Sequence, residues 1–266
     1  MSGGPEAAPG AWRLNGRVAL ITGAQRGIGF ACAEAFVGAG AGVACVDLPG
    51  DEFEAAVERL GPTVSAHATD LAEVEKTGSL VADVVRQHGR LDILVNAAGV
   101  LAPASFLDLT PDEWDRTLAV NARASVFTAQ ACARHFVKEE VAGRIIFFAS
   151  IVGRSIVRLN NTAYSASKAA IIQAARCMAL ELAPHSITVN TISPGSTATD
   201  MLVRVQARGD VESIVRGNAA EWRLGIPLGR LAEPSDQAAL ALFLAGHGAR
   251  HITGQDLAVD GGQTTV

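Results

Sequence analysis

The hydrophobic pattern of the chain alternates between short apolar runs and longer segments with helical character. The short runs are rich in Val, Ile, Leu and Ala and end at polar or glycine residues, so they predict buried strands. These predicted strands cover residues 17–22, 42–47, 63–69, 91–96, 144–150, 186–192 and 255–260. The segments between them predict helices at 27–39, 52–60, 73–88 and 111–138, a helix that contains Tyr164 and stops before Pro184, and a last one at 234–244.

Regular alternation of strands and helices determines the predicted fold class. Strands that are apolar along their whole length are buried on both faces, which is typical of a parallel sheet covered by helices on each side. We therefore predict a doubly wound α/β domain of about seven parallel strands. The chain shows no long linker, internal repeat or change in composition, so we expect a flexible tail at 1–13 and one domain at 14–266.

Composition excludes several classes of function. A net charge of −5 with 18% charged residues argues against a nucleic-acid surface and against disorder. No apolar run is long enough for a membrane span, and residues 1–11 have no apolar signal-peptide core. The four cysteines (Cys32, Cys45, Cys132 and Cys177) lie in apolar stretches without metal spacing, which predicts buried free thiols in a reducing cytoplasm. The helical metal spacing of His247 and His251 is interrupted by glycine, so we expect no metal site.

Candidate chemistry begins with Tyr164 and Lys168. Side chains four residues apart lie on the same face of a helix, so the phenol and the ammonium should point the same way. A phenol has an unperturbed pKa near ~10, and a neighbouring ammonium is expected to move that pKa toward the working range of a base. Ser150 ends the predicted strand 144–150, where its hydroxyl could hold a substrate oxygen beside the phenol. On its own this spacing also fits an ordinary helix surface.

A glycine turn follows the first predicted strand. Its glycines are Gly23, Gly27 and Gly29, and such a turn lets backbone N–H groups and a helix N-terminus approach a pyrophosphate. Asp47 ends the second predicted strand, where a carboxylate can bind the adenosine ribose and would repel a 2′-phosphate. Arg26 is the opposing signal, because a basic residue in the turn could bind that phosphate. Asp47 outweighs it, and we predict NAD as the cofactor.

Together these residues resemble a known family. The chain resembles the classical short-chain dehydrogenases/reductases from Leu14 to Gly262. The motifs that carry the resemblance are Gly23-x-x-x-Gly27-x-Gly29, Asn96-Ala97-Ala98-Gly99, Asn121, Ser150, Tyr164-x-x-x-Lys168 and Pro194-Gly195. The resemblance implies a Rossmann-type sheet, a nicotinamide cofactor and a homotetramer.

The resemblance also implies a role for each matching residue. Tyr164 would be the catalytic acid/base, Lys168 would lower its pKa and hold the nicotinamide ribose, and Ser150 would fix the reacting oxygen. Asn121 would hold a water that links Lys168 to solvent. Asp70 would contact the adenine and Thr197 would orient the carboxamide. The other cofactor contacts implied are Gly23, Gln25, Arg26, Gly27, Ile28, Gly29, Asp47, Leu71, Asn96, Ala97, Gly99, Pro194 and Gly195. Taken singly, Asn121 also fits a helix-surface amide and Asp70 a turn residue.

One spacing departs from the family. Ser150 and Tyr164 are separated by one residue more than in most members. The extra residue should bulge in the loop 151–162, which borders the substrate and precedes the predicted helix. We therefore expect the catalytic residues to keep their places, while correspondences within that loop are open.

Within the family, the second half of the chain carries the substrate signal. Residues 193–201, 222–229 and 251–262 resemble the 2,3-dihydro-2,3-dihydroxybenzoate dehydrogenase branch, whose members oxidise a cyclohexadiene diol acid to a catechol acid. Arg158 matches an arginine of that branch and could bind a ring carboxylate, although a solvated loop charge is nearly as good an explanation. This chain differs from the branch in its longer loop and in Leu101 and Ala102, where the branch tends to have a second arginine, so a related ring acid such as a dihydro-hydroxyanthranilate is also open. Arg154 could supply the missing charge, and Met201 is a further candidate contact.

Alternatives from two other groups of proteins fit part of the same pattern. A ketoreductase acting on a carrier-bound acyl chain would share the fold, but it normally uses NADPH, which Asp47 disfavours. A nucleotide-binding protein without catalysis typically loses the tyrosine or the lysine, and both are present here. We therefore expect a small cyclic acid or alcohol as substrate, with no nucleic-acid or membrane partner. The helix predicted at 111–138 and the helix of Tyr164 are apolar on more than one face. The additional apolar face fits either contacts with another subunit or packing in the core.

Overall fold

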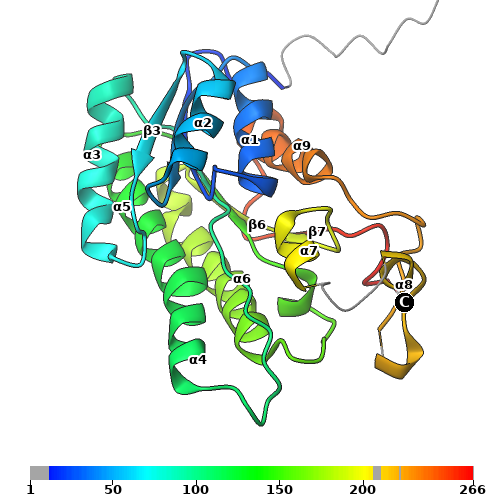
Figure 1. The fold of residues 1–266 in the computed structure, drawn as a ribbon. Coiled ribbons are helices and arrows are strands. Elements are labelled where there is room, and N and C mark those ends of the chain that lie inside the picture. The colour runs from blue at the N-terminus through cyan, green and yellow to red at the C-terminus, as the bar shows by residue number, and fades with distance from the viewer. Residues whose placement is uncertain (1–11, 206–210, 222, 266) are drawn as a thin grey trace, which may run out of the picture.

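The computed structural model describes residues 12–205, 211–221 and 223–265. Within these ranges the chain forms one parallel sheet with helices on both faces, which confirms the predicted fold class (Figure 1). Tail residues 1–11 and Trp222 lie outside the described residues. The contacts of the domain already begin within the predicted tail, because the Trp12 ring packs against Phe243 at 5.5 Å between centroids.

The strands agree closely with the apolar runs. They are β1 (Val18–Thr22), β2 (Gly42–Asp47), β3 (Val64–Ala68), β4 (Ile93–Asn96), β5 (Arg144–Phe148), β6 (Thr188–Pro194) and β7 (Asp256–Val259). The helices are α1 (Gly27–Gly38), α2 (Asp51–Leu60), α3 (Thr77–His88), α4 (Pro111–Leu118), α5 (Ser125–Lys138), α6 (Thr162–Leu182), α7 (Asp200–Val205), α8 (Val211–Arg216) and α9 (Pro234–Ala245).

The strand order reverses in the middle of the sheet. The order is β3-β2-β1-β4-β5-β6-β7, and every neighbouring pair is parallel. Thr22 at the end of β1 pairs with Asn96 at the end of β4. Because successive crossovers leave β1 and β4 in opposite directions, a crevice opens at their carboxyl ends, where ligands bind in open sheets of this kind.

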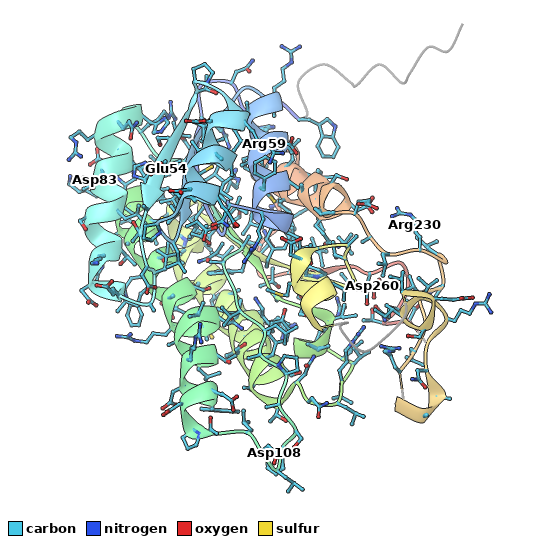
Figure 2. All side chains as sticks on the ribbon, in the orientation of Figure 1. Glu54, Arg59, Asp83, Asp108, Arg230 and Asp260 are labelled. Carbon is cyan, nitrogen blue, oxygen red and sulfur yellow. The ribbon has the colours of Figure 1, made fainter. Side chains whose placement is uncertain are left out.

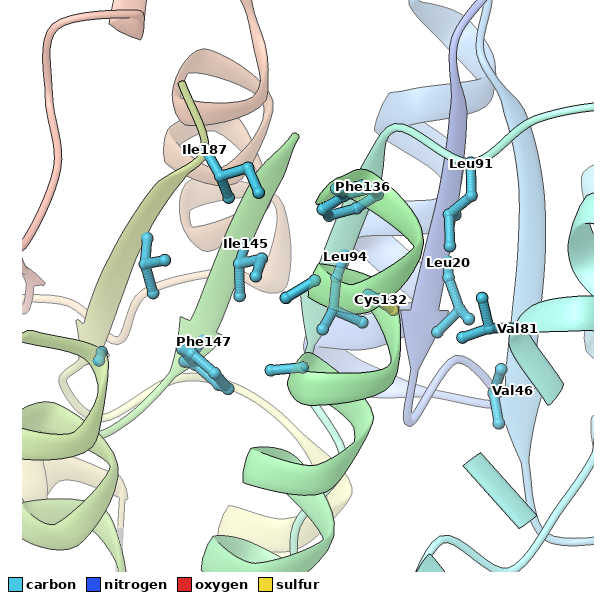
Figure 3. Close-up of a cluster of buried hydrophobic side chains, with 14 of the residues drawn as sticks. Leu20, Val46, Val81, Leu91, Leu94, Cys132, Phe136, Ile145, Phe147 and Ile187 are labelled. Carbon is cyan, nitrogen blue, oxygen red and sulfur yellow. The ribbon is translucent and has the colours of Figure 1, made fainter. Parts of the chain in front are cut away.

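Two hydrophobic layers hold the helices on the sheet. In β1, Leu20 faces one layer, and its neighbours Ala19 and Ile21 face the other, as the alternation of a strand requires. The first layer packs α3, α5 and α6, with Phe136 and Cys132 of α5 lying over the strands (Figure 3). The second packs α1, α2 and α9. Charged side chains such as Glu54, Arg59 and Asp108 lie at the surface instead (Figure 2).

The helix predicted at 111–138 forms with these bounds, but it is not α-helical throughout. It begins at a capping box in which the Thr110 hydroxyl accepts from the Glu113 backbone N–H, and the Glu113 carboxylate accepts in return from the Thr110 N–H. A π-helical segment, Ala119–Ala124, then separates α4 from α5. Apolar periodicity does not register such a bulge, which is common at functional sites.

Other differences lie in details. Helices α7 and α8 were not predicted, because neither short segment has a helical apolar period. Cys32, Cys45 and Cys132 are buried as expected, but Cys177 is exposed, since it lies on the outward face of α6. Burial raises the pKa of Cys45 to about 12, so this thiol is unreactive. No helix in the described ranges has the length and apolarity that a membrane crossing requires.

Candidate active site

A cavity of about 680 Å³ lies at the carboxyl ends of β4, β5 and β6. The loops that follow the three strands contribute Gly99, Ser150 and Thr197 to its lining. Tyr164 and Lys168 enter from the first turns of α6, one turn apart as their spacing predicts. The structure thus gathers residues from four separate stretches of sequence around one space.

Ser150 and Tyr164 form the polar centre of this cavity. The two hydroxyls are hydrogen-bonded to each other. The backbone N–H of Val152 donates to the Ser150 oxygen at 3.4 Å, so the serine proton remains available for the phenol oxygen. The extra residue in the following loop therefore leaves the serine–tyrosine contact in place.

Burial dominates the titration of the two α6 residues. It raises the pKa of Tyr164 to about 12, against smaller lowering effects from the Ser150 hydrogen bond and the charge of Arg158. It lowers the pKa of Lys168 to about 8. The Lys168 ammonium donates to the Phe148 carbonyl at 2.9 Å and lies 5.6 Å from the centroid of the tyrosine ring. Desolvation of the phenolate thus outweighs the charges near it here, and the effect of Lys168 on the tyrosine pKa stays a prediction.

Asn121 lies in the π-helical segment and is buried. Its side-chain oxygen accepts from the Val100 N–H at 2.8 Å, and its amide donates to the Val100 carbonyl at 2.9 Å and the Ser167 hydroxyl at 3.1 Å. A Cβ placed on Gly99 would lie 3.3 Å from the Asn121 oxygen and 3.5 Å from the Lys168 nitrogen, so both polar groups border the same small space. The helix-surface alternative for Asn121 is excluded by its burial.

The glycine turn has the shape that a pyrophosphate requires. Gly23 adopts φ +68°, and a Cβ on Gly29 would lie 2.1 Å from the Gly23 carbonyl oxygen, so only glycine fits there. Helix α1 then begins at Gly27, and its N-cap residue Arg26 makes no side-chain capping bond. The backbone N–H groups at this helix end remain for an anion, and the turn fits a dinucleotide.

Asp47 lies beside the turn at the end of β2. Its carboxylate accepts from the Gln25 N–H at 2.9 Å and from the Leu48 N–H at 2.9 Å, which fixes its position. Arg26, the opposing signal for cofactor choice, extends toward Asp200 of α7 at 4.0 Å. A carboxylate held rigidly at this point fits a ribose diol and disfavours a phosphate there.

The two arginines of the loop after β5 have different surroundings. Arg158 lines the cavity, and its guanidinium donates to the Ser196 hydroxyl at 3.0 Å. Arg154 turns away to β7, where it donates to the Asp256 carbonyl at 3.2 Å and lies 3.6 Å from the buried Asp256 carboxylate. The structure therefore does not support Arg154 as the replacement charge in the substrate site.

Comparison with known proteins identifies the family. A family model described as enoyl-(acyl carrier protein) reductase matches residues 23–264. A 2,3-dihydro-2,3-dihydroxybenzoate dehydrogenase of Bacillus subtilis (strain 168) is 37% identical and aligns with 94% of this chain and 97% of its own length. The crystal structure of a short-chain type dehydrogenase/reductase from Mycobacterium marinum matches with a TM-score of 0.87 at 32% identity, covering 96% of this chain and 98% of that one. The chain is a short-chain dehydrogenase/reductase.

Relatives of this short-chain dehydrogenase/reductase differ in their substrates. A sorbitol dehydrogenase of Cereibacter sphaeroides is 36% identical and aligns with 94% of this chain and 98% of its own length. Membership therefore establishes an oxidoreductase that uses a nicotinamide cofactor, NAD or NADP, and confirms the predicted family.

Not all the predicted residues of this short-chain dehydrogenase/reductase line the cavity. The cavity is lined by Ile28, Ala97, Gly99, Ser150, Arg158, Tyr164, Lys168, Pro194, Gly195, Thr197 and Met201. The glycine turn, Gln25, Arg26 and Asp47 lie outside that lining, and Asn96 ties the sheet together by accepting from Thr22 and donating to the Ser125 carbonyl. Asp70 is exposed, and its carboxylate accepts from the Ala72 N–H at 2.9 Å. This contact is typical of a turn residue, which was the alternative to an adenine contact. Leu71 is buried in the core.

Some cavity residues were not predicted. Ser196 follows Pro194-Gly195 directly, so its position in the motif was a usable signal. Ile214 of α8 and Arg223 also line the cavity, and the Arg223 guanidinium donates to the Ser213 carbonyl and hydroxyl at 3.0 Å. No local pattern in the sequence points to these contacts, because they come from short elements that tertiary packing brings over the cavity.

Proposed function

We propose that this protein is an NAD-dependent dehydrogenase that oxidises a ring CH–OH group of a cyclic acid to the aromatic acid. The substrate class is a cyclohexadiene dihydrodiol-type acid, such as 2,3-dihydro-2,3-dihydroxybenzoate or a related dihydro-hydroxyanthranilate. The pathway would be siderophore or secondary-metabolite biosynthesis in the cytoplasm. The main support for this proposal is the position of Arg158, which lines the same cavity as Tyr164 and is hydrogen-bonded there to Ser196.

In the proposed reaction, each of these cavity residues has its own role. Tyr164 accepts the proton of the substrate hydroxyl, and Ser150 donates a hydrogen bond that holds the reacting oxygen. Lys168 lies beside the phenol ring and would favour its ionised form, and Asn121 would hold a water that links Lys168 to solvent. The nicotinamide ring, when bound, supplies the hydride acceptor for the substrate carbon. The resulting ring ketone then enolises to the aromatic acid, so one hydride and one proton leave the substrate in total.

The choice of NAD over NADP rests on Asp47. Two backbone N–H groups hold its carboxylate in place, so it cannot turn away from a 2′-phosphate without losing both bonds. The ion pair of Arg26 with Asp200 is long and exposed, and it directs that guanidinium toward α7. Both features favour a free 2′-hydroxyl on the ribose.

The test is a matched substrate panel on the purified protein. Reduction of NAD and of NADP is followed by absorbance with a dihydrodiol acid, the same dihydrodiol as its methyl ester, and a neutral cyclic diol. We expect NAD to be reduced, with the acid far above the ester in kcat/KM. The proposal would be refuted by a higher kcat/KM for the ester than for the acid, or by equal rates of reduction of NADP and NAD.

A neutral polyol is the second candidate substrate. The sorbitol dehydrogenase relative covers this chain as fully as the ring-acid dehydrogenase does. The same panel separates the two, because a polyol carries no carboxylate for Arg158. Activity with sorbitol that exceeds activity with every ring acid would favour this candidate.

A homotetramer is part of the proposal. Phe127 and Val137 of α5 and Leu180 of α6 are exposed apolar side chains on two helices that pack side by side (Figure 1). Exposed apolar groups of this kind on long helices fit a contact between subunits. Light scattering after size exclusion gives the mass directly, and charged substitutions at Leu180 and Val137 should reduce it.

A further inference from the structure

Gln237 is a fully buried glutamine on α9 with an exposed fraction of 0%. Its side-chain nitrogen lies 2.9 Å from the Val259 carbonyl oxygen of β7 and 3.2 Å from the Thr197 hydroxyl oxygen. The amide thus connects a helix of the outer layer with the loop after β6 that lines the cavity. No motif of the sequence draws attention to this position.

The direction of each hydrogen bond in this group follows from the Val259 carbonyl. A carbonyl oxygen only accepts, so the amide must present its NH₂ group to Val259. The second hydrogen of the same NH₂ is then donated to the Thr197 oxygen. Thr197 has a single proton, which it donates to the Gly195 carbonyl at 3.1 Å. With that proton engaged, the hydroxyl has only an acceptor lone pair left to offer.

Stability alone does not explain the glutamine. The Val259 carbonyl also accepts from the Gly195 N–H at 3.0 Å, so it is satisfied without Gln237. The Gln237 side-chain oxygen is buried and has no hydrogen-bond partner among the described residues, which is a cost for folding. An apolar side chain of the same size would avoid that cost. The feature that an apolar side chain would lose is the N–H that holds the Thr197 hydroxyl in this orientation.

We propose that Gln237 is a positioning residue that keeps Thr197 a hydrogen-bond acceptor toward the cofactor, and so selects a primary carboxamide on the nicotinamide ring. Thr197 is 5% exposed and lines the cavity shared with Tyr164 and Lys168. An acceptor at that point pairs with the N–H of an amide and not with a group that lacks one. This inference rests on the part of the proposed function that places a nicotinamide cofactor in the cavity.

The experiment compares two dinucleotides that differ in one group. NADH has a carboxamide, whereas reduced 3-acetylpyridine adenine dinucleotide has a methyl ketone with no N–H. Dissociation constants for both are measured by calorimetry with the wild type and with Gln237→Met, which keeps the volume and removes the donors. We expect the preference for the amide to fall about two- to tenfold in the variant, the equivalent of one neutral hydrogen bond. Binding of the ketone should stay the same, because a methyl ketone donates no hydrogen bond to the Thr197 oxygen.

Controls separate this effect from a general loss of structure. Gln263→Met changes a second fully buried glutamine, which donates to the Leu224 carbonyl outside the cavity, and should leave the preference unchanged. Thr197→Val should remove the preference, and adding Gln237→Met to it should change nothing further. Gln237→Leu supplies a second apolar shape, and thermal unfolding checks the fold of each variant.

Several results would overturn the inference. These are an unchanged preference in Gln237→Met, an equal loss for both dinucleotides, or additive effects of Gln237→Met and Thr197→Val. If the wild type binds neither dinucleotide, the cofactor assignment falls together with the inference. If it binds NADH with the expected preference but oxidises no ring acid, only the proposed substrate is wrong, because this experiment contains no substrate.

Discussion

Replacing Arg158 with alanine tests the substrate assignment most directly. Arg158 lines the cavity that Tyr164 also lines, and its guanidinium donates to the Ser196 hydroxyl at 3.0 Å. A hydrogen bond to a charged group contributes about 1.5–3 kcal/mol. Arg158 is only half-buried, and solvent screening places its contribution at the lower end of that range. We therefore expect kcat/KM for a ring acid to fall about tenfold.

The same substitution has a second, independent consequence. The positive charge of Arg158 is one of the causes that lower the pKa of Tyr164, so its removal raises that pKa. Tyr164 must be deprotonated to act as a base in the oxidation direction, so the acidic limb of kcat/KM should move to higher pH. This shift affects acidic and neutral substrates alike. The ratio of kcat/KM for the acid to kcat/KM for its ester at one pH therefore isolates the contact with the carboxylate.

The assay is therefore a pH profile of kcat/KM for a ring acid and for its methyl ester. We expect the ratio of kcat/KM for the acid to kcat/KM for the ester to fall about tenfold at every pH, while both acidic limbs shift to higher pH. Arg154→Ala is the matched control, because that guanidinium is bound to Asp256 outside the cavity. Equal losses for acid and ester in Arg158→Ala, or an acid-specific loss in Arg154→Ala, would refute the reasoning.

Three further predictions address the base, the cofactor and stability. Tyr164→Phe should lower kcat by about 10²–10⁴ while calorimetry still detects NADH binding. Asp47→Ser should reduce the preference for NAD over NADP in kcat/KM, and full retention of that preference would contradict the role of the carboxylate. His67 and His88 both hydrogen-bond the Ser65 hydroxyl, and burial lowers the pKa of each below the ordinary value of 6.5. Since the unfolded chain then binds protons more readily, the melting temperature should fall as pH drops below 6.5, and a double His→Gln variant should lose this dependence.

The fold and the placement of Tyr164 beside Lys168 were predictable because their signals are local. Each strand of the sheet is an apolar run that ends at a turn residue, and Tyr164 and Lys168 share a helix face because of their spacing alone. The glycine turn is likewise specified by contacts between near neighbours, such as Gly29 against the Gly23 carbonyl. Short-range geometry of this kind can be read from the order of residues.

Long-range contacts were not predictable in the same way. The pairing of Gln237 with Thr197 joins residues that are 40 positions apart, and nothing near either one indicates the other. The π-helical segment around Asn121 is also invisible to apolar periodicity, although it positions a polar side chain beside Gly99. The pKa of Tyr164 depends on how completely the surrounding chain excludes water, so its raised value could not be deduced from the neighbouring Lys168 alone.

The lengthened loop after β5 is held in place by contacts with α6, with β7 and with the segment after β6. Gly153 packs so closely on α6 that a Cβ would lie 2.6 Å from the Ala169 nitrogen, which fixes the start of the loop next to this helix. Arg154 then anchors it to Asp256 of β7, and Arg158 anchors it to Ser196 after β6. The extra residue is therefore confined between fixed points and does not displace Ser150 from the phenol. Family motifs on either side of the loop remain transferable for this reason, whereas the direction of each arginine within it had to come from the structure.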